Sequence, residues 1–329
     1  MNVDGTMHSK NLVKKEQNYM GIFSVLFILV GLCIFEIVSS IDNAVINAEV
    51  LGTMSEKGKK FFLVYGLIFA VFVVRGLLPW LIVWLTNTSL GPIGALTATF
   101  SNDPHVQDAI ETSKPFLMLG GGIFLVFLFL QWLFMEDKKF GLTSEKFFLK
   151  HGAWFYAVVS IILVAVVAFS LKYNYMLALS AVIGSSAFFI TDGFKKNAES
   201  NENQLLNNKG SMSDISKILY LEIIDTTFSI DGVLGAFAFT MSVPLIILGN
   251  GLGALVVRQL TIGNIDNIKK YVYLKNGAMY SILCLGTVMI LEGFSVEVPQ
   301  FISPLVTLSV IALFFWKSVV YEKNHKKGK

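Results

Sequence analysis

Charged residues are scarce in this chain, and their scarcity excludes a soluble domain. Asp, Glu, Lys and Arg make up 15% of the 329 residues, whereas hydrophobic residues make up 54%. The mean hydropathy of +0.65 is far above that of soluble domains, so segments long enough to cross a bilayer are expected. The net charge of +3 is small and the basic residues gather between apolar runs, which excludes a nucleic-acid surface and makes the lipid bilayer a predicted partner.

Cysteine and histidine are also rare, and their positions exclude a zinc site and a disulfide framework. Cys33 and Cys284 lie in separate apolar runs without Cys-x-x-Cys spacing or a neighbouring histidine, so both are predicted to be packing residues. The histidines all lie in predicted loops or termini: His8, His105, His151 and His325. We predict no resident cofactor, no catalytic residue and no enzyme activity.

Nine apolar runs predict an all-α, polytopic transmembrane helix bundle. The predicted spans are 21–50, 61–85, 116–135, 153–171, 176–190, 218–241, 245–257, 272–291 and 302–316. The first span contains several polar residues, and the seventh is short and interrupted by glycines. The predicted regions are a polar N-terminal segment at 1–19, a first transmembrane half at 20–194, a mobile polar loop at 195–217, a second half at 218–318 and a basic tail at 319–329.

Lysine and arginine are distributed unevenly over the predicted loops. Most of them fall on alternate loops and on the C-terminal tail, which the positive-inside rule assigns to the cytoplasm. We therefore expect a protein of the bacterial inner membrane with its N-terminus outside and its C-terminus in the cytoplasm. Lys10, Lys14 and Lys15 in the N-terminal segment are evidence against this orientation.

Two similar acidic motifs interrupt the apolar runs. The first is Glu36-Ile-Val-Ser-Ser-Ile-Asp-Asn43 in the first predicted span, and the second is Asp225-Thr-Thr-Phe-Ser-Ile-Asp-Gly232 in the sixth. Both place Ser-Ile-Asp at the same distance from an acid. Because an odd and an even span cross the membrane in opposite directions, the pair predicts an inverted-topology repeat with interrupted helices and a solute site between its halves.

Helical periodicity separates the acids within each motif. The predicted polar faces comprise Glu36, Ser40, Asn43 and Asn47 on the first helix, and Glu222, Asp225 and Ser229 on the sixth. Asp42 and Asp231 lie about two-thirds of a turn away from these faces. We therefore predict that both helices are unwound at Ser-Ile-Asp, so that the two aspartates converge and backbone carbonyls become extra ligands.

Acidic side chains inside a membrane-spanning bundle need partners that offset the free energy of burying their charge. Inserting an ionisable side chain near the bilayer centre costs about 2.5 to 3.5 kcal/mol. The five acids of the two motif helices together cost roughly 12 kcal/mol or more before partners are counted; they are Glu36, Asp42, Glu222, Asp225 and Asp231. Arg75 and Arg258 are predicted charge partners or gates, and Asn250 either bridges helices or lines the path. Because the acids outnumber these bases, the cluster retains negative charge for a cation or for protons.

The ligand atoms in these motifs are all oxygens. Hard oxygen ligation favours Mn²⁺, Mg²⁺ or Ca²⁺ over Zn²⁺ or Cu⁺, and Na⁺ and H⁺ stay open by the same argument. The predicted metal ligands are Glu36, Ser40, Asp42, Asn43, Glu222, Asp225, Ser229 and Asp231.

Three stretches resemble the TerC family of bacterial membrane proteins: residues 36–44, residues 225–236 and the Asn-Gly-Leu-Gly-Ala-Leu-Val-Val-Arg run at 250–258. The resemblance extends over residues 21–316 and implies manganese export, effects on metal loading of other membrane or secreted proteins, and a link to tellurium resistance. The acidic positions of the family correspond to Glu36, Asp42, Asn43, Asp225 and Asp231. Where the family has a small polar residue and a proline after the second aspartate, this chain has Gly232 and Val233.

Two other classes of function stay open. An intramembrane aspartyl protease needs two aspartates that share a proton, and Asp42 with Asp231 formally meet that need. The surplus acids and the lack of a Gly-x-Gly-Asp stretch argue against it. A non-transporting scaffold would instead recruit partners through residues 195–217 and the tail. The sequence favours export of a divalent cation, Mn²⁺ above all, by alternating access and in exchange for protons.

Overall fold

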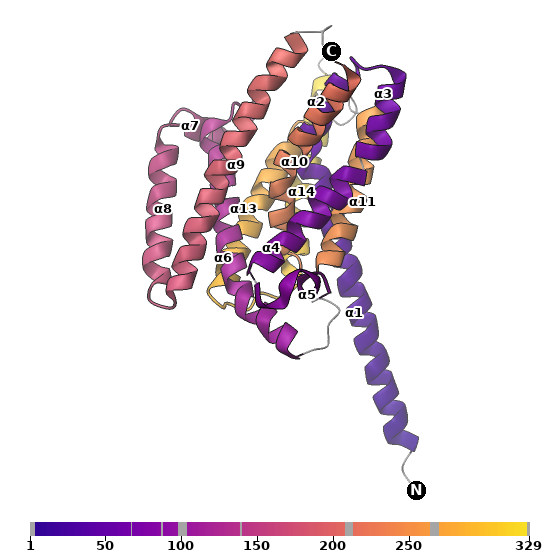
Figure 1. Cartoon of the computed structure of the whole chain (residues 1–329), viewed down its shortest axis with the longest axis vertical. Coiled ribbons are helices and arrows are strands. Elements are labelled where there is room, and N and C mark those ends of the chain that lie inside the picture. Colours follow the sequence, from indigo (N-terminus) through magenta and orange to yellow (C-terminus); the bar gives the residue numbers. More distant parts are fainter. Residues whose placement is uncertain are drawn as a thin grey trace.

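The computed structural model describes residues 4–66, 68–86, 88–97, 104–138, 140–207, 213–263 and 270–327. Every regular element in these ranges is helical, which confirms the all-α prediction. The elements are α1 Asp4–Ser39, α2 Ile41–Leu51, α3 Glu56–Phe61, η1 Phe62–Gly66, η2 Phe69–Leu77, α4 Leu78–Thr86, η3 Thr88–Leu90, α5 Gly91–Thr97, α6 Pro104–Met135, α7 Thr143–Leu149, α8 Trp154–Ser170, α9 Tyr175–Asn207, α10 Asp214–Phe237, α11 Val243–Gly263, α13 Leu274–Gly293 and α14 Ile302–Lys327. Of these, η1 and η2 are π-helices and η3 is a 3₁₀-helix. Figure 1 shows most of them side by side in one bundle, from which the N-terminal part of α1 projects.

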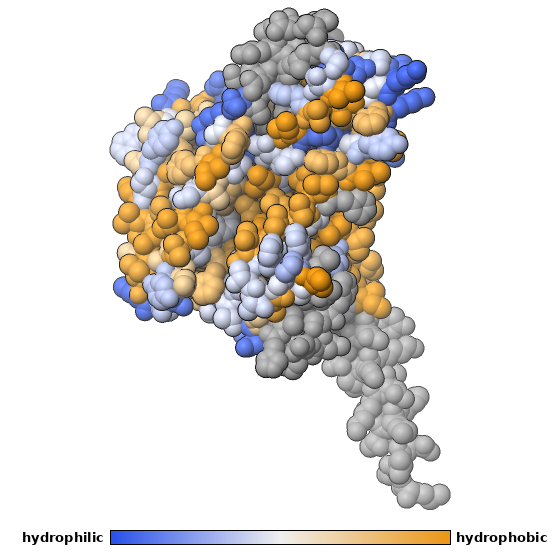
Figure 2. All heavy atoms as spheres, in the orientation of Figure 1, coloured by the Kyte–Doolittle hydropathy of each residue, from blue (hydrophilic) through white to orange (hydrophobic). Residues whose placement is uncertain are grey.

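The bundle is that of a multi-pass membrane protein. Seven described helical segments are long and apolar enough to cross a bilayer, and α7 with α8, bent by 96° relative to each other, is an eighth candidate. On the face seen in Figure 2, hydrophobic residues lie across the middle and hydrophilic residues lie toward both ends. The remaining predicted span, 218–241, corresponds to α10. This helix is less apolar because every 18-residue stretch of it contains Glu222, Asp225 and Asp231.

The centre of the bundle is α6, in which 83% of the residues in the most apolar 18-residue stretch of Glu111–Met135 are buried. It packs against α9 and α13 through glycines, which let helix backbones approach closely. A Cβ at Gly184 of α9 would collide with the backbone of Gly120, and a Cβ at Gly122 would lie 2.8 Å from the carbonyl oxygen of Gly286 in α13. Helices from both halves of the chain therefore share one core.

Most segments that carry the predicted cytoplasmic lysines gather at one end of the bundle. Figure 1 shows α3, α7, the end of α9 and the C-terminus at the upper end, whereas α5, the α8–α9 turn and the N-terminus lie at the other end. This arrangement agrees with the alternation of basic loops along the sequence. The side of the membrane on which each end lies stays a prediction.

The second motif helix is not interrupted. α10 runs without a break from Asp214 to Phe237, so the predicted unwinding at Ser-Ile-Asp-Gly is wrong. Glycine costs about 1 kcal/mol relative to alanine inside a helix, and packing against α1 compensates for it at Gly232, which lies next to Glu36.

The first motif helix deviates at a single residue. α1 ends at Ser39 and α2 begins at Ile41, while Ser40 between them has φ −93° and ψ 4°. The amide of Ser40 still donates to the Glu36 carbonyl, and that of Ala44 to the Ser40 carbonyl, both at 3.0 Å. The predicted interruption is therefore present at Ser40, but it frees neither of these two carbonyl groups.

Two predicted irregular segments are also helical. α11 continues from Val243 to Gly263 through its glycines, so the predicted interruption of the seventh span is wrong. The predicted mobile loop at 195–217 is helical at 195–207, as the end of α9, and again from Asp214. Its Lys, Glu and Gln residues have good helix propensity, and extending an existing helix avoids the cost of nucleation.

Candidate functional site

The two motif helices cross the bundle in opposite directions, as predicted. Gly31 of α1 lies against Phe239, which follows the end of α10. Four residues later along α1, Phe35 lies against Gly235, four residues earlier along α10. The antiparallel course is thereby confirmed, and the common origin of the two halves stays a prediction.

α11 packs against α1 through a Gly249-x-x-x-Gly253 spacing. A Cβ at Gly249 would lie 2.5 Å from Cβ of Leu32, and one at Gly253 would lie 2.6 Å from Cβ of Glu36. Small residues at this spacing allow two helices to approach closely. Residue numbers increase in the same direction along both helices at these contacts, so α11 runs parallel to α1. Glu36 lies where α1, α10 and α11 meet.

Arg75 joins the two motif helices at this junction. Its side chain and that of Glu36 are each 2% exposed. Nη2 and Nε of Arg75 donate to Oε1 of Glu36 at 2.5 and 3.1 Å, and Nη1 lies 3.5 Å from Oδ2 of Asp225. Oγ of Ser40 donates to the same Glu36 oxygen at 2.7 Å. One guanidinium is therefore a charge partner for the leading acid of each motif.

Pro79 explains the unusual backbone around Arg75. Proline has no N–H, so the carbonyl of Arg75, four residues earlier, cannot make its α-helical hydrogen bond to position 79. The preceding turns, η2, are wound as a π-helix, in which each hydrogen bond spans five residues. Nη1 of Arg75 also donates to the carbonyl of Ala70 at 3.2 Å, which fixes the side chain along this wide turn.

Arg258 forms a second ion pair, which is partly buried. Its Nη2 donates to Oε1 of Glu222 at 3.3 Å, and its guanidinium carbon lies 4.1 Å from the ring centre of Phe62. A cation over an aromatic face is stabilised where water is excluded. A Cβ at Gly66 would collide with the side chain of Glu222, so glycine makes room for this pair.

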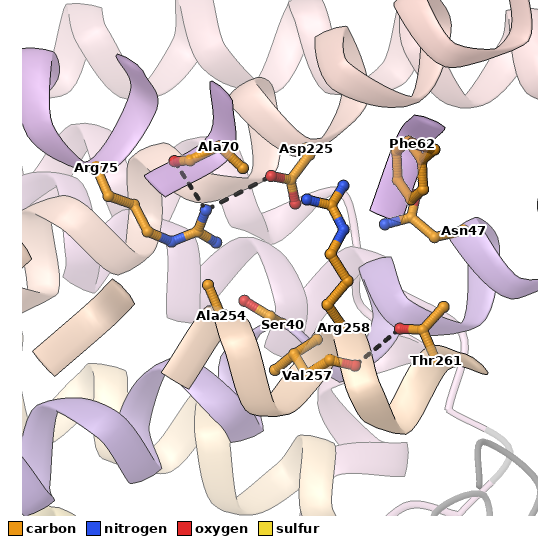
Figure 3. Close-up of a pocket in the computed structure, with 10 residues that line it drawn as sticks. All are labelled: Ser40, Asn47, Phe62, Ala70, Arg75, Asp225, Ala254, Val257, Arg258 and Thr261. Atoms are coloured by element: carbon orange, nitrogen blue, oxygen red, sulfur yellow. Dashed lines mark hydrogen bonds and ion pairs between the residues drawn. The ribbon is translucent and has the colours of Figure 1, made fainter. Parts of the chain in front are cut away.

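A cavity of about 30 Å³ lies among these side chains. Figure 3 shows Asp225 between the guanidinium groups of Arg75 and Arg258, with Ser40 and Asn47 from the first motif helix among the other lining residues. A single water needs roughly 10–15 Å³ of such space, so the cavity has room for one or two waters or for one ion.

The described cluster is acidic overall. Its three carboxylates, on Glu36, Glu222 and Asp225, and its two guanidiniums give a formal net charge of −1. Among the described residues, Oε2 of Glu222, Oδ1 of Asn47 and Oγ of Ser229 are buried without a hydrogen-bond partner. No three Asp, Glu, His or Cys side chains in the described ranges are grouped closely enough to hold a metal ion in this arrangement. A cation would therefore require the arginines to release carboxylates.

Asp231 does not join this cluster. Because α10 stays helical, Asp231 lies about two-thirds of a turn from Asp225 and faces α9. It pairs there with Lys195, and the two side chains are 13% and 12% exposed. The predicted convergence of Asp42 and Asp231 is thus corrected, because it needed an unwound α10 that the structure does not have.

Neutralising Asp231 is expected to destabilise the fold. Asp231→Asn leaves Lys195 largely buried without its carboxylate, and breaking one side of a buried pair costs about 3 kcal/mol at the lower end of the usual range. Adding Lys195→Met removes both charges and is expected to recover most of that loss. Thermal unfolding in detergent measures both variants. Wild-type stability of the single variant would contradict a stabilising ion pair.

The structure brings four of the predicted ligands to this site: Glu36, Ser40, Glu222 and Asp225. Ser229 is buried one turn after Asp225 on α10. The side chains of Asp42 and Asn43 lie outside the described residues, so their role as ligands stays a prediction. Asn250 on α11 is 0% exposed, and neither of its amide atoms has a partner among the described residues.

Sequence reasoning missed several residues that shape the site. Phe62 and Gly66 stand in an apolar run with nothing to distinguish them from other aromatic and small residues. Lys195 falls in the stretch that composition predicts to be a polar loop, and its partner Asp231 is 36 residues away in the sequence. The Gly249-x-x-x-Gly253 spacing is itself a signal for close helix packing, although the glycines of this run also favour the predicted interruption.

A family model described as "Protein of unknown function (DUF475)" matches residues 41–325. The match includes Arg75, Glu222, Asp225 and Arg258 and begins after Glu36. No curated protein and no solved structure matches the chain.

Proposed function

This chain belongs to the DUF475 family, and we propose that it is a membrane transporter for a hard divalent cation, Mn²⁺ above all. The supporting observation is the buried, acidic cluster that joins α1, η2, α10 and α11 around a small cavity. Ionisable side chains inside a membrane bundle are costly and commonly mark substrate pathways. Oxygen ligands favour hard cations, and the resemblance to the TerC family favours Mn²⁺ among them.

In this proposal Arg75 is the internal counter-ion of the empty site. The guanidinium holds Glu36 of α1 and Asp225 of α10 to η2. A cation that binds these carboxylates competes with Arg75 and weakens the links between the three segments. Occupancy of the site thereby biases the relative positions of α1 and α10, as alternating access requires.

We also propose an orientation in the membrane and a coupling ion. The C-terminus and the basic end of the bundle lie in the cytoplasm of a bacterial cell, the N-terminus lies outside, and the cation leaves the cell. Protons exchange for the cation because carboxylates bind either. Effects on other membrane or secreted proteins follow from the metal supply.

The protease alternative has less support. An aspartyl dyad needs two carboxyl groups that share a proton, whereas Asp231 pairs with Lys195 on the face of α10 turned away from the cluster. A non-transporting scaffold would leave the buried cluster without a role other than stability.

Flux in proteoliposomes tests the proposal. Purified protein is reconstituted, and entry of Mn²⁺, Mg²⁺, Ca²⁺, Zn²⁺ and Na⁺ is compared with that in protein-free vesicles. We expect Mn²⁺ flux that saturates and is accompanied by proton movement. Glu56→Gln is the matched control, because Glu56 is an exposed acid that pairs with Lys59 and should transport like wild type. Equal entry of every cation with and without protein would reject transport and favour the scaffold.

A further inference from the structure

Asn250 is a buried polar residue that the fold leaves unused. Its side chain is 0% exposed, and neither Oδ1 nor Nδ2 has a hydrogen-bond partner among the described residues. Buried amides are nearly always satisfied, because an unpaired one is destabilising. By contrast Asn276 on α13, also buried, donates to both carboxylate oxygens of Glu145 at 3.0 and 2.8 Å.

The neighbours of Asn250 define its direction. Gly249 faces Leu32 of α1, and Gly251 faces Val71 of η2. Since successive residues of a helix turn by about 100°, Asn250 points between α1 and η2. The opposite side of α11 carries Leu248 and Leu252, which are 55% and 50% exposed.

The same face of α11 continues into the cluster. Ala254 and Arg258, one and two turns after Asn250, line the cavity. Gly253 packs against Glu36, so Asn250 lies about one turn beyond the Glu36–Arg75 pair, on the side away from the cavity.

An apolar layer closes the bundle beyond Asn250. Ile246 lies one turn further on the same face and is 0% exposed, as are Leu32 and Phe35 of α1. The ring of Phe35 lies 5.8 Å from that of Phe239, measured between centres. Asn250 therefore lies at the boundary between the charged cluster and this layer.

We propose that Asn250 is the last oxygen ligand on the cation path, which the ion or its hydration water contacts between the Glu36 carboxylate and the apolar layer. This inference rests on the proposed transport function. The amide oxygen is a suitable ligand for a hard divalent cation. Nδ2 can donate a hydrogen bond to a water or a carboxylate that coordinates the ion. The layer of Leu32, Phe35, Phe239 and Ile246 is then the barrier that must open after the ion reaches Asn250.

Three variants and MnCl₂ test this role. Asn250→Leu keeps the shape of the side chain and removes both polar atoms, Asn250→Asp restores an oxygen, and Asn276→Leu is the control for loss of a buried amide. Asn250→Leu is expected to raise the dissociation constant for Mn²⁺ and the KM for flux by about 10-fold or more, as loss of a supporting metal contact does. Its melting temperature should be unchanged or higher, because no hydrogen bond is lost. Asn276→Leu should show the reverse: a lower melting temperature and a wild-type dissociation constant.

The outcomes separate this inference from the transport proposal. Asn250→Leu with a wild-type dissociation constant and KM would overturn the assignment, as would failure of Asn250→Asp to bind Mn²⁺ better than Asn250→Leu. If wild-type protein binds Mn²⁺ without moving it, transport is rejected and the binding constants still decide the role of Asn250. If wild-type protein binds no Mn²⁺, both proposals fall.

Discussion

Replacing Arg75 by methionine is expected to lower the free energy of unfolding by about 5 kcal/mol, the upper end of the cost of breaking a buried ion pair. The reason is that two carboxylates, on Glu36 and Asp225, lose the same guanidinium inside the bundle. The measurement is thermal and denaturant-induced unfolding of purified protein in detergent. Lys59→Met is the matched control, because its exposed pair with Glu56 is worth only about 0–1 kcal/mol.

A compensating variant separates charge from shape at the same position. Glu36→Gln and Asp225→Asn combined with Arg75→Met remove all three charges, and replacing a whole buried ion network by neutral groups is often nearly neutral for stability. We therefore expect the triple variant to fold nearly as well as wild type. Equal destabilisation in the single and triple variants would show that Arg75 acts through packing and not through its charge.

Glu36→Gln is expected to reduce cation flux by about 100-fold or more, since even a supporting contact of a metal site contributes about 10- to 100-fold. The fold should survive, because the amide oxygen of glutamine can accept hydrogen bonds from Arg75 and Ser40 as Oε1 of Glu36 does. Asp225 keeps its own contact with Arg75 in this variant. Flux and melting temperature are measured on the same preparation.

Glu292→Gln is the control for this experiment. Glu292 of α13 pairs with Lys114 of α6, away from the cluster. The Glu292→Gln variant should therefore transport cations at the wild-type rate. If Glu36→Gln and Glu292→Gln transported Mn²⁺ at the same rate, Glu36 would have no part in the path.

Helical phase predicted the composition of the charged cluster well. The sequence placed Glu36 and Ser40 on one face and Glu222, Asp225 and Ser229 on another, and the structure makes these faces meet because both helices stay regular enough for the phase to hold. The same regularity defeats the prediction for Asp231. Asp231 does lie on a different face of α10 from Asp225, as its helical phase indicates. Lys195 on α9 pairs with it there, so no unwinding of α10 is needed.

The partners of the cluster could not be predicted because they depend on tertiary packing. Nothing in the sequence relates Gly66 to Glu222, or Lys195 to Asp231, before α9, η1 and α10 are known to be neighbours. The polar stretch at 195–207 was expected to be irregular on composition alone, yet it extends α9. Composition indicates exposure to water, and exposure does not exclude a helix.

In the proposed function, the carboxylates of Glu36 and Asp225 bind the transported cation. Equilibrium titration of MnCl₂ into wild-type protein and into the Glu36→Gln/Asp225→Asn/Arg75→Met variant tests it most directly, because that variant is expected to fold without the charges. We predict saturable binding to wild type and none to the variant above that of empty detergent micelles. Equal affinity of the two proteins for Mn²⁺ would contradict the account.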